Sequence, residues 1–246
     1  MNLKVIYCEI LEEEVANAAH CSPHKLDISN ILMESCHEKV TEGKLEIQKA
    51  LDNESGKPWD YILLGWGLCG RMLTGVTARD IPLVLPRSHD CLTMMFGSRE
   101  AYSTYFLNNS GTYYLSRGWM KHAGDKGGEL GSQMQMGELS LDYAELAEQY
   151  GEENASYLAE ILGGWDSHYN KACLIVQEHD NQAELLSQAK ELVKSRRWSI
   201  ETRAGSLELL KNWLHGNWNE KDFLIVNPGQ TICESYDDGI FTAIKE

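Results

Sequence analysis

Short apolar runs that alternate with amphipathic stretches are the feature of this sequence that most constrains its fold. Each run is four or five residues long and is bounded by Gly, Pro, Asn or Asp, which is typical of a strand buried on both faces of a parallel sheet. The expected strands are Lys4–Cys8, Tyr61–Gly65, Pro82–Leu85, Thr112–Leu115, Cys173–Val176 and Phe223–Val226.

Apolar residues at helical spacing fill the segments between these runs. The expected helices are Leu26–Leu51 with Asp27 or Ser29 as N-cap, Cys91–Phe106, Leu141–Leu162, Gln182–Val193 and Ser206–Leu214. Strands that alternate with helices predict an α/β fold with a mostly parallel sheet flanked by helices, a Rossmann-like three-layer sandwich.

The length of 246 residues is compatible with one α/β domain over residues 1–246 or with two similar halves, 1–120 and 138–246. Residues 121–137 join these halves and are rich in Gly, Met and Gln. This stretch has no clean period, so both an ordered lid and a disordered loop stay open as interpretations.

The charge and cysteine content exclude several classes of protein. The formal net charge of −15 argues against a nucleic-acid surface or an anionic membrane as partner. The sequence shows no secretory signal and no apolar stretch of roughly 18 to 20 residues, so we expect a cytoplasmic protein. Its seven cysteines form no CxxC pair and are better interpreted as thiols, packed or metal-binding, than as a disulfide framework.

Three cysteines and a histidine follow the ends of the first three expected strands. Cys8 closes the first strand, Cys69 follows the second, and His89 and Cys91 follow the third. Ligands of open α/β sheets bind outside the carboxyl ends of the strands, where the loops converge. We therefore expect these four side chains to lie at one edge of the sheet, as a site for zinc or an iron–sulfur cluster.

Five further residues are candidates for ligand binding in the same loops. Arg87 carries positive charge that would help hold thiolates, and Asp90 lies between the candidate ligands. Gly67 and Gly70 would let backbone amides approach a cluster, an anion or a substrate. Trp119 follows the fourth strand beside a glycine and could form the wall of a pocket for a planar cofactor.

Two other interpretations of these residues stay open. In one, the thiols are packed hydrophobes and the glycine and tryptophan loops bind a ligand without catalysis. In the other, Cys69 or Cys91 is a nucleophile, with His89 as its base and Asp90 as the group that orients the base. A Walker motif is missing and no GxGxxG follows the first strand, which argues against ATP or NAD binding.

An ordered series of motifs resembles the DUF1638 family of uncharacterised proteins. The motifs are GLCG at 67–70, LVLPRSHDC at 83–91, FGS at 96–98 and GTYYLSRGW at 111–119, with weaker likeness in YCEIL at 7–11 and FLIVNPGQTI at 223–232. Arg71 and Met72 depart from the pattern, because the family has small or amide residues after GLCG.

The resemblance implies a role in one-carbon metabolism, because members are similar to proteins of anaerobic bacteria and methanogens encoded near corrinoid-dependent methyltransferases. The chain lacks a DxHxxG motif, so a corrinoid would be carried by a partner protein. The leading hypothesis is a metal- or iron–sulfur-binding protein in or accessory to this metabolism, and whether it is an enzyme stays open. The residues that the resemblance singles out are Cys8, Cys69, Arg87, His89, Asp90 and Cys91.

Overall fold

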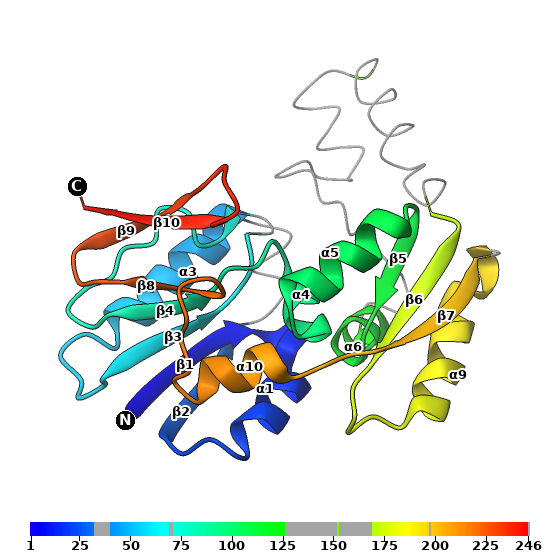
Figure 1. Cartoon of the computed structure of the whole chain (residues 1–246), viewed down its shortest axis with the longest axis horizontal. Helices are drawn as coiled ribbons and strands as arrows, with labels where there is room; N and C mark the ends of the chain where they lie inside the picture. Colours follow the sequence, from blue (N-terminus) through cyan, green and yellow to red (C-terminus); the bar gives the residue numbers. More distant parts are fainter. Residues whose placement is uncertain (32–39, 69–70, 126–151, 153–168, 197, 246) are drawn as a thin grey trace. The chain divides into compact units, whose positions relative to one another are not determined.

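The computed structural model describes residues 1–31, 40–68, 71–125, 152, 169–196 and 198–245 (Figure 1). The chain divides into two compact units. Unit 1 comprises Met1–Tyr105, Gln177–His179 and Ala204–Glu246, and unit 2 comprises Phe106–Val176 and Asp180–Arg203. The expected number of domains, with halves 1–120 and 138–246, stays a prediction. Most of the expected loop at 121–137 and of the expected helix at 141–162 lies outside the described residues.

Unit 1 is built on a five-stranded sheet in the order β2-β1-β3-β4-β8. Its strands are β1 (Asn2–Cys8), β2 (Lys25–Ile31), β3 (Tyr61–Gly65), β4 (Leu83–Pro86) and β8 (Phe223–Val226). The first four run parallel, whereas β8 pairs antiparallel with β4. The apolar runs of β1, β3 and β4 thus occupy the buried middle of the sheet, as the sequence predicts, whereas the run of β8 lies at its edge.

Helices α1 (Glu12–Ala19), α3 (Val40–Asp52) and α10 (Glu208–Leu214) cover the faces of this sheet (Figure 1), and a 3-10 turn η1 (Glu9–Leu11) follows β1. Helices α4 (Cys91–Phe96) and α5 (Arg99–Asn108) follow β4 in the chain, and the last residues of α5 belong to unit 2. Helices α1 and α10 lie side by side over one face, and α3 lies behind the sheet (Figure 1). Trp213 of α10 is fully buried and its indole Nε1 donates to the Val84 carbonyl at 3.1 Å, which fixes α10 on β4.

A hairpin completes unit 1. Strands β9 (Gln230–Glu234) and β10 (Phe241–Lys245) pair antiparallel. On its other side β9 bonds to residues 75–78, because Gly75 and Ala78 donate their backbone N–H groups to the Ile232 and Gln230 carbonyls at 2.8 and 2.9 Å. The segment that follows β3 is therefore held against the C-terminal hairpin.

The expected helix Leu26–Leu51 is wrong in its first part. Residues Lys25–Ile31 form the edge strand β2, residues 32–39 lie outside the described residues, and helix α3 spans Val40–Asp52. The apolar pattern is ambiguous, because Leu26 and Ile28 are spaced as in a strand whereas Ile28 and Ile31 are spaced as in a helix, and the pairing with β1 decides the structure. Asp27 is not an N-cap; it forms an ion pair with Lys4 on the neighbouring strand.

The expected helix Cys91–Phe106 is broken into α4 and α5. Gly97 lies between them with φ 81°, a left-handed conformation that ends α4. A Cβ on Gly97 would stand 2.5 Å from the Ser206 Cβ, so the break also lets the segment before α10 pass close by. The FGS motif thus marks a helix end.

Unit 2 contains a smaller three-stranded sheet in the order β5-β6-β7. Its strands are β5 (Thr112–Leu115), β6 (Lys171–Val176) and β7 (Ser199–Ala204), of which β5 and β6 are parallel. Its helices are α6 (Arg117–Asp125) and α9 (Gln182–Val193), followed by the 3-10 turn η4 (Lys194–Arg196). The core of unit 2 consists of Tyr113, Leu115, Met120, Ala172, Leu174, Leu185, Ala189, Val193 and Trp198.

The chain is thus a mixed α/β protein with a mostly parallel central sheet, as predicted. All six strands expected from the sequence are present, while β2, β7, β9 and β10 were not expected. In the described part of the chain, every helix is too short or too polar to cross a lipid bilayer.

Candidate functional site

The carboxyl ends of three neighbouring parallel strands form the candidate site. Strand β1 ends at Cys8, β3 at Gly65 and β4 at Pro86, and β3 lies between the other two. Because the strands are parallel, the loops that follow them leave the same edge of the unit 1 sheet. These are the loops that carry the predicted ligands.

The loops after β3 and β4 lie in direct contact. A Cβ on Gly67 would stand 2.6 Å from both the Cα and the backbone N of Asp90, so only glycine fits here. One residue further on, the Leu68 N–H donates to the Ser88 carbonyl at 2.9 Å. Cys69 and Gly70, which follow Leu68, lie outside the described residues.

Cys8 and Cys91 are both buried, with 3% and 8% of their surface exposed. Cys8 is the last residue of β1 and Cys91 is the first residue of α4. Among the described residues, no group of three or more His, Cys, Asp or Glu side chains is arranged to hold a metal ion. Whether Cys69 completes such a group stays a prediction.

Negative charge surrounds the end of β1. Burial raises the pKa of Tyr7 to about 12, and the carboxylates of Glu12 and Glu9 contribute to the same rise.

Asp90 is held in place by hydrogen bonds from two residues, Thr93 and Tyr102. It is the N-cap of α4, and its Oδ1 accepts from the Thr93 N–H at 3.1 Å. Its Oδ2 accepts from the Tyr102 hydroxyl at 2.8 Å. Burial nevertheless raises the pKa of the Asp90 carboxyl, although these hydrogen bonds and the nearby His89 act in the opposite direction. His89 itself is exposed at the surface.

Arg87 is tied to backbone carbonyls. Its Nε donates to the Glu220 and Phe223 carbonyls at 3.0 and 3.2 Å. Its Nη1 donates to the Gly239 and Phe241 carbonyls at 2.6 and 2.5 Å. Burial and the neighbouring Arg99 lower the pKa of Arg87. Contact of this guanidinium with a bound ligand stays a prediction.

The residues that depart from the family pattern have defined positions. Arg71 adopts φ 57° and forms a two-point ion pair with Glu234 of β9, with 2.6 Å between its Nη2 and Oε2. This pair raises the pKa of Arg71 and lowers that of Glu234. Met72 is buried at 1% exposure. The bulky cation is thus bound by the C-terminal hairpin.

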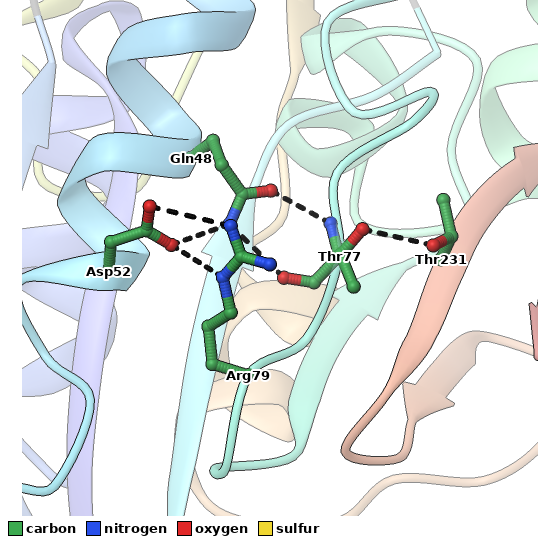
Figure 2. Close-up of polar contacts among 5 residues, drawn as sticks. All are labelled: Gln48, Asp52, Thr77, Arg79 and Thr231. Carbon is green, nitrogen blue, oxygen red and sulfur yellow. Dashed lines mark hydrogen bonds and ion pairs between the residues drawn. The ribbon is translucent and has the colours of Figure 1, made fainter.

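A polar network holds the rest of this segment to α3 and β9 (Figure 2). The Gln48 carboxamide pairs with the Thr77 backbone, accepting from its N–H at 2.9 Å and donating to its carbonyl at 3.3 Å. The Thr77 hydroxyl meets the Thr231 hydroxyl at 3.0 Å, and Arg79 donates to Asp52 at 2.6 Å. The segment downstream of Cys69 is therefore anchored at several points.

Two buried polar groups lie in the loops of the candidate site without a hydrogen-bond partner in the described parts of the chain. They are the Trp66 indole Nε1 and the Ser88 hydroxyl, in side chains that are 1% and 0% exposed. Buried donors are usually satisfied, so each of these groups calls for an explanation such as an ordered water or a ligand. The burial of the Trp66 ring shows that it packs in the interior of unit 1.

Trp119 belongs to unit 2, at the start of α6 after β5. Its N–H donates to the Ser116 hydroxyl at 3.3 Å, and its ring meets His122 edge-on at 6.4 Å between centroids. Its predicted role beside the unit 1 cysteines stays a prediction.

Sequence reasoning missed two partners of the site, Tyr102 and Glu234. Tyr102 lies twelve residues beyond Asp90, on the far side of the Gly97 break, and Glu234 lies 163 residues from Arg71. Gly97 indicates a helix break, after which α5 can turn back toward α4. This signal could have predicted that Tyr102 lies near Asp90. No local signal connects Arg71 with Glu234.

Comparison with known proteins gives one match. A family model described as "Protein of unknown function (DUF1638)" matches residues 31–214. Neither a curated protein nor a solved structure matches the chain. The matched range contains the loops after β3 and β4 but excludes Cys8 and the C-terminal hairpin.

Proposed function

Because the chain belongs to the DUF1638 family of proteins of unknown function, we propose its role from the unit 1 site. Cys8, Cys69 and Cys91 are thiolate ligands of a zinc ion or an iron–sulfur cluster, and His89 is a fourth ligand or a donor to one of them. The protein acts in, or as an accessory to, corrinoid-dependent one-carbon metabolism. Catalysis is not part of this proposal.

The contact between the loops after β3 and β4 carries the proposal. Gly67 packs on the backbone of Asp90, and Leu68 bonds to Ser88, so the residues next to Cys69 and Cys91 touch. Adjacent strands lie about 4.8 Å apart, which separates β1 from β4 by about 10 Å. Cys69, after the strand between them, is therefore the thiol that would link Cys8 to Cys91.

The chemistry of the donors supports a soft or borderline metal. Three thiols with an imidazole suit tetrahedral zinc or an iron–sulfur cluster. A metal in this place would supply Lewis acidity or redox chemistry. The chain itself would supply backbone amides at Gly67 and Gly70, and Asp90 would orient the start of α4 through Thr93 and Tyr102.

The remaining parts of the proposal concern the surroundings of the site. We propose that Arg87 lies near the ligand, because it directly precedes the loop of His89 and Cys91. Trp119 is proposed to form a wall of the ligand pocket. A corrinoid would come with a partner protein, because the sequence has no motif that binds it. We also propose that the fold is a Rossmann-like sandwich, which a solved structure would test.

Metal analysis of protein purified without oxygen tests this function. Iron with acid-labile sulfide, or zinc, should be present near one site per chain. Cys69→Ser and Cys91→Ser should each lose it, because a serine hydroxyl is a poor ligand for these metals. Cys21→Ser is the matched control, since Cys21 is an exposed thiol of the same unit. Wild-type protein that contains neither zinc nor iron would refute the proposal.

A second candidate function is a non-catalytic binding module for a corrinoid protein or a small ligand. The burial of Cys8 and Cys91 favours it, because free cysteine often packs as a small hydrophobe. Thiol titration separates the candidates. Packed thiols should react only on unfolding, whereas metal ligands should react once a chelator has removed the metal.

A further inference from the structure

Two arginines bracket the segment that carries His89, Asp90 and Cys91. Arg87 precedes it and Arg99 follows it at the start of α5. Both bind residues 220–241, which we call the C-terminal arm. Arg87 donates to four carbonyls of the arm, those of Glu220, Phe223, Gly239 and Phe241, at 2.5 to 3.2 Å.

Arg99 reaches the same two stretches of the arm. Its Nη1 donates to the Lys221 carbonyl at 3.1 Å and its Nη2 donates to the Asp238 carbonyl. The Arg87 backbone N–H also donates to the Asp222 carbonyl at 2.7 Å. The segment 87–99, which includes α4, is thus fastened to the arm at both of its ends.

The tip of the arm has a conformation that needs outside support. Ile240 has φ 64°, which is a rare and unfavourable conformation for a β-branched residue. Its side chain is 1% exposed, and the carbonyls on either side of it, those of Gly239 and Phe241, are the two that Arg87 Nη1 binds. Backbone strain of this kind persists where the surroundings over-determine it.

We propose that Arg87 and Arg99 are positioning residues, through which the C-terminal arm holds the candidate site in its binding geometry. The arm holds the loop of His89, Asp90 and Cys91 in place through the two guanidinium groups. Lysine cannot replace either arginine, because a single ammonium group lacks the planar fork that reaches several carbonyls at once. The arm lies beyond residues 31–214, so this support comes from outside the matched part of the chain.

Hydrogen exchange of the full chain as purified tests the coupling between arm and loop. Arg87→Lys and Arg99→Lys should speed the exchange of amides in residues 91–96 and 238–241 by roughly tenfold, since hydrogen bonds to charged groups are lost. Arg79→Lys is the matched control: the Arg79 guanidinium binds the Asp52 carboxylate of α3 instead of carbonyls of the arm, and its replacement should leave these amides unchanged. Unchanged exchange at 91–96 in both Arg87→Lys and Arg99→Lys would overturn the proposal.

The effect of these arginines on metal affinity is measured separately, and this part of the proposal rests on the proposed function. Cobalt(II) titration should give an affinity about 10 to 100 times weaker in Arg87→Lys than in wild type, as for other residues that orient metal ligands. An unchanged cobalt affinity, together with faster amide exchange, would show that the arm only stabilises the loop, and would overturn the positioning role of Arg87. A wild type that binds no cobalt and contains neither zinc nor iron as purified would instead refute the proposed function, while the exchange result would still decide the coupling.

Discussion

Replacing Gly67 by alanine is the most direct test of the contact between the two loops. The new Cβ would stand 2.6 Å from the Cα and N of Asp90 and 2.9 Å from its carbonyl carbon. Ordinary contacts begin at 3.4 Å, and all three neighbours are backbone atoms that no rotamer change can move. The loops must therefore separate by several tenths of an ångström.

The loss in the free energy of unfolding follows from this displacement of the two loops. Added atoms in a well-packed place typically destabilise by about 1–3 kcal/mol, and the bond from Leu68 to Ser88 would be strained as well. We expect a fall in the thermal unfolding midpoint of roughly 2 to 12 °C for a chain of this size. Circular dichroism at 222 nm measures it.

Gly56→Ala is the control for the effect of losing a glycine as such. Gly56 has φ 75°, and a Cβ added to it would have no atom within 4 Å, so alanine there meets only the backbone penalty of about 1 to 2 kcal/mol. Metal content adds a second readout, because Gly67→Ala should also displace Cys69. A Gly67→Ala protein with the wild-type midpoint and wild-type metal content would refute the reasoning about the contact.

Three further predictions follow from single contacts. Burial raises the pKa of Asp90 above its unfolded value, so the folded state binds more protons than the unfolded state. The free energy of unfolding should therefore fall as the pH rises from about 4 through the folded pKa. Asp90→Asn, which can still cap α4, should flatten this pH dependence in urea unfolding measured across pH. Trp213→Phe should lower the free energy of unfolding by about 1–3 kcal/mol, because it leaves the buried Val84 carbonyl without its donor; an unchanged urea midpoint would contradict this. A double-mutant cycle on Arg71 and Glu234 should give a coupling of at most about 1 kcal/mol that weakens in high salt, because the Arg71 side chain is 67% exposed.

The six predicted strands could be recognised because each carries a short, continuously apolar run. This holds for central strands such as Tyr61–Gly65 and Leu83–Pro86 and also for β5 and β8, which lie at sheet edges. A strand without such a run could not be predicted. Lys25–Ile31 has one neighbour only and mixes polar with apolar residues, so its pattern does not distinguish strand from helix.

The candidate site was predictable to the level of loops. The rule that parallel strands present their carboxyl ends together placed Cys8 and Cys91 on one edge. The partners that fix the loops come from distant positions: Tyr102 lies beyond a helix break, and the carbonyls that bind Arg87 lie more than 130 residues away. Carbonyl groups carry no side-chain signal, so the contacts of Arg87 with the backbone could not be predicted from the sequence.

The antiparallel pairing of β8 with β4 also bears on how the chain reaches its native state. Arg87, at the end of β4, and Phe223, which opens β8, are 136 residues apart. During synthesis the apolar edge of β4 is therefore made long before the strand that covers it. Such an uncovered edge is a template for pairing with other chains, and contacts this distant in sequence slow folding. We expect nascent chains to depend on chaperones, or to aggregate, until residues 223–226 have left the ribosome.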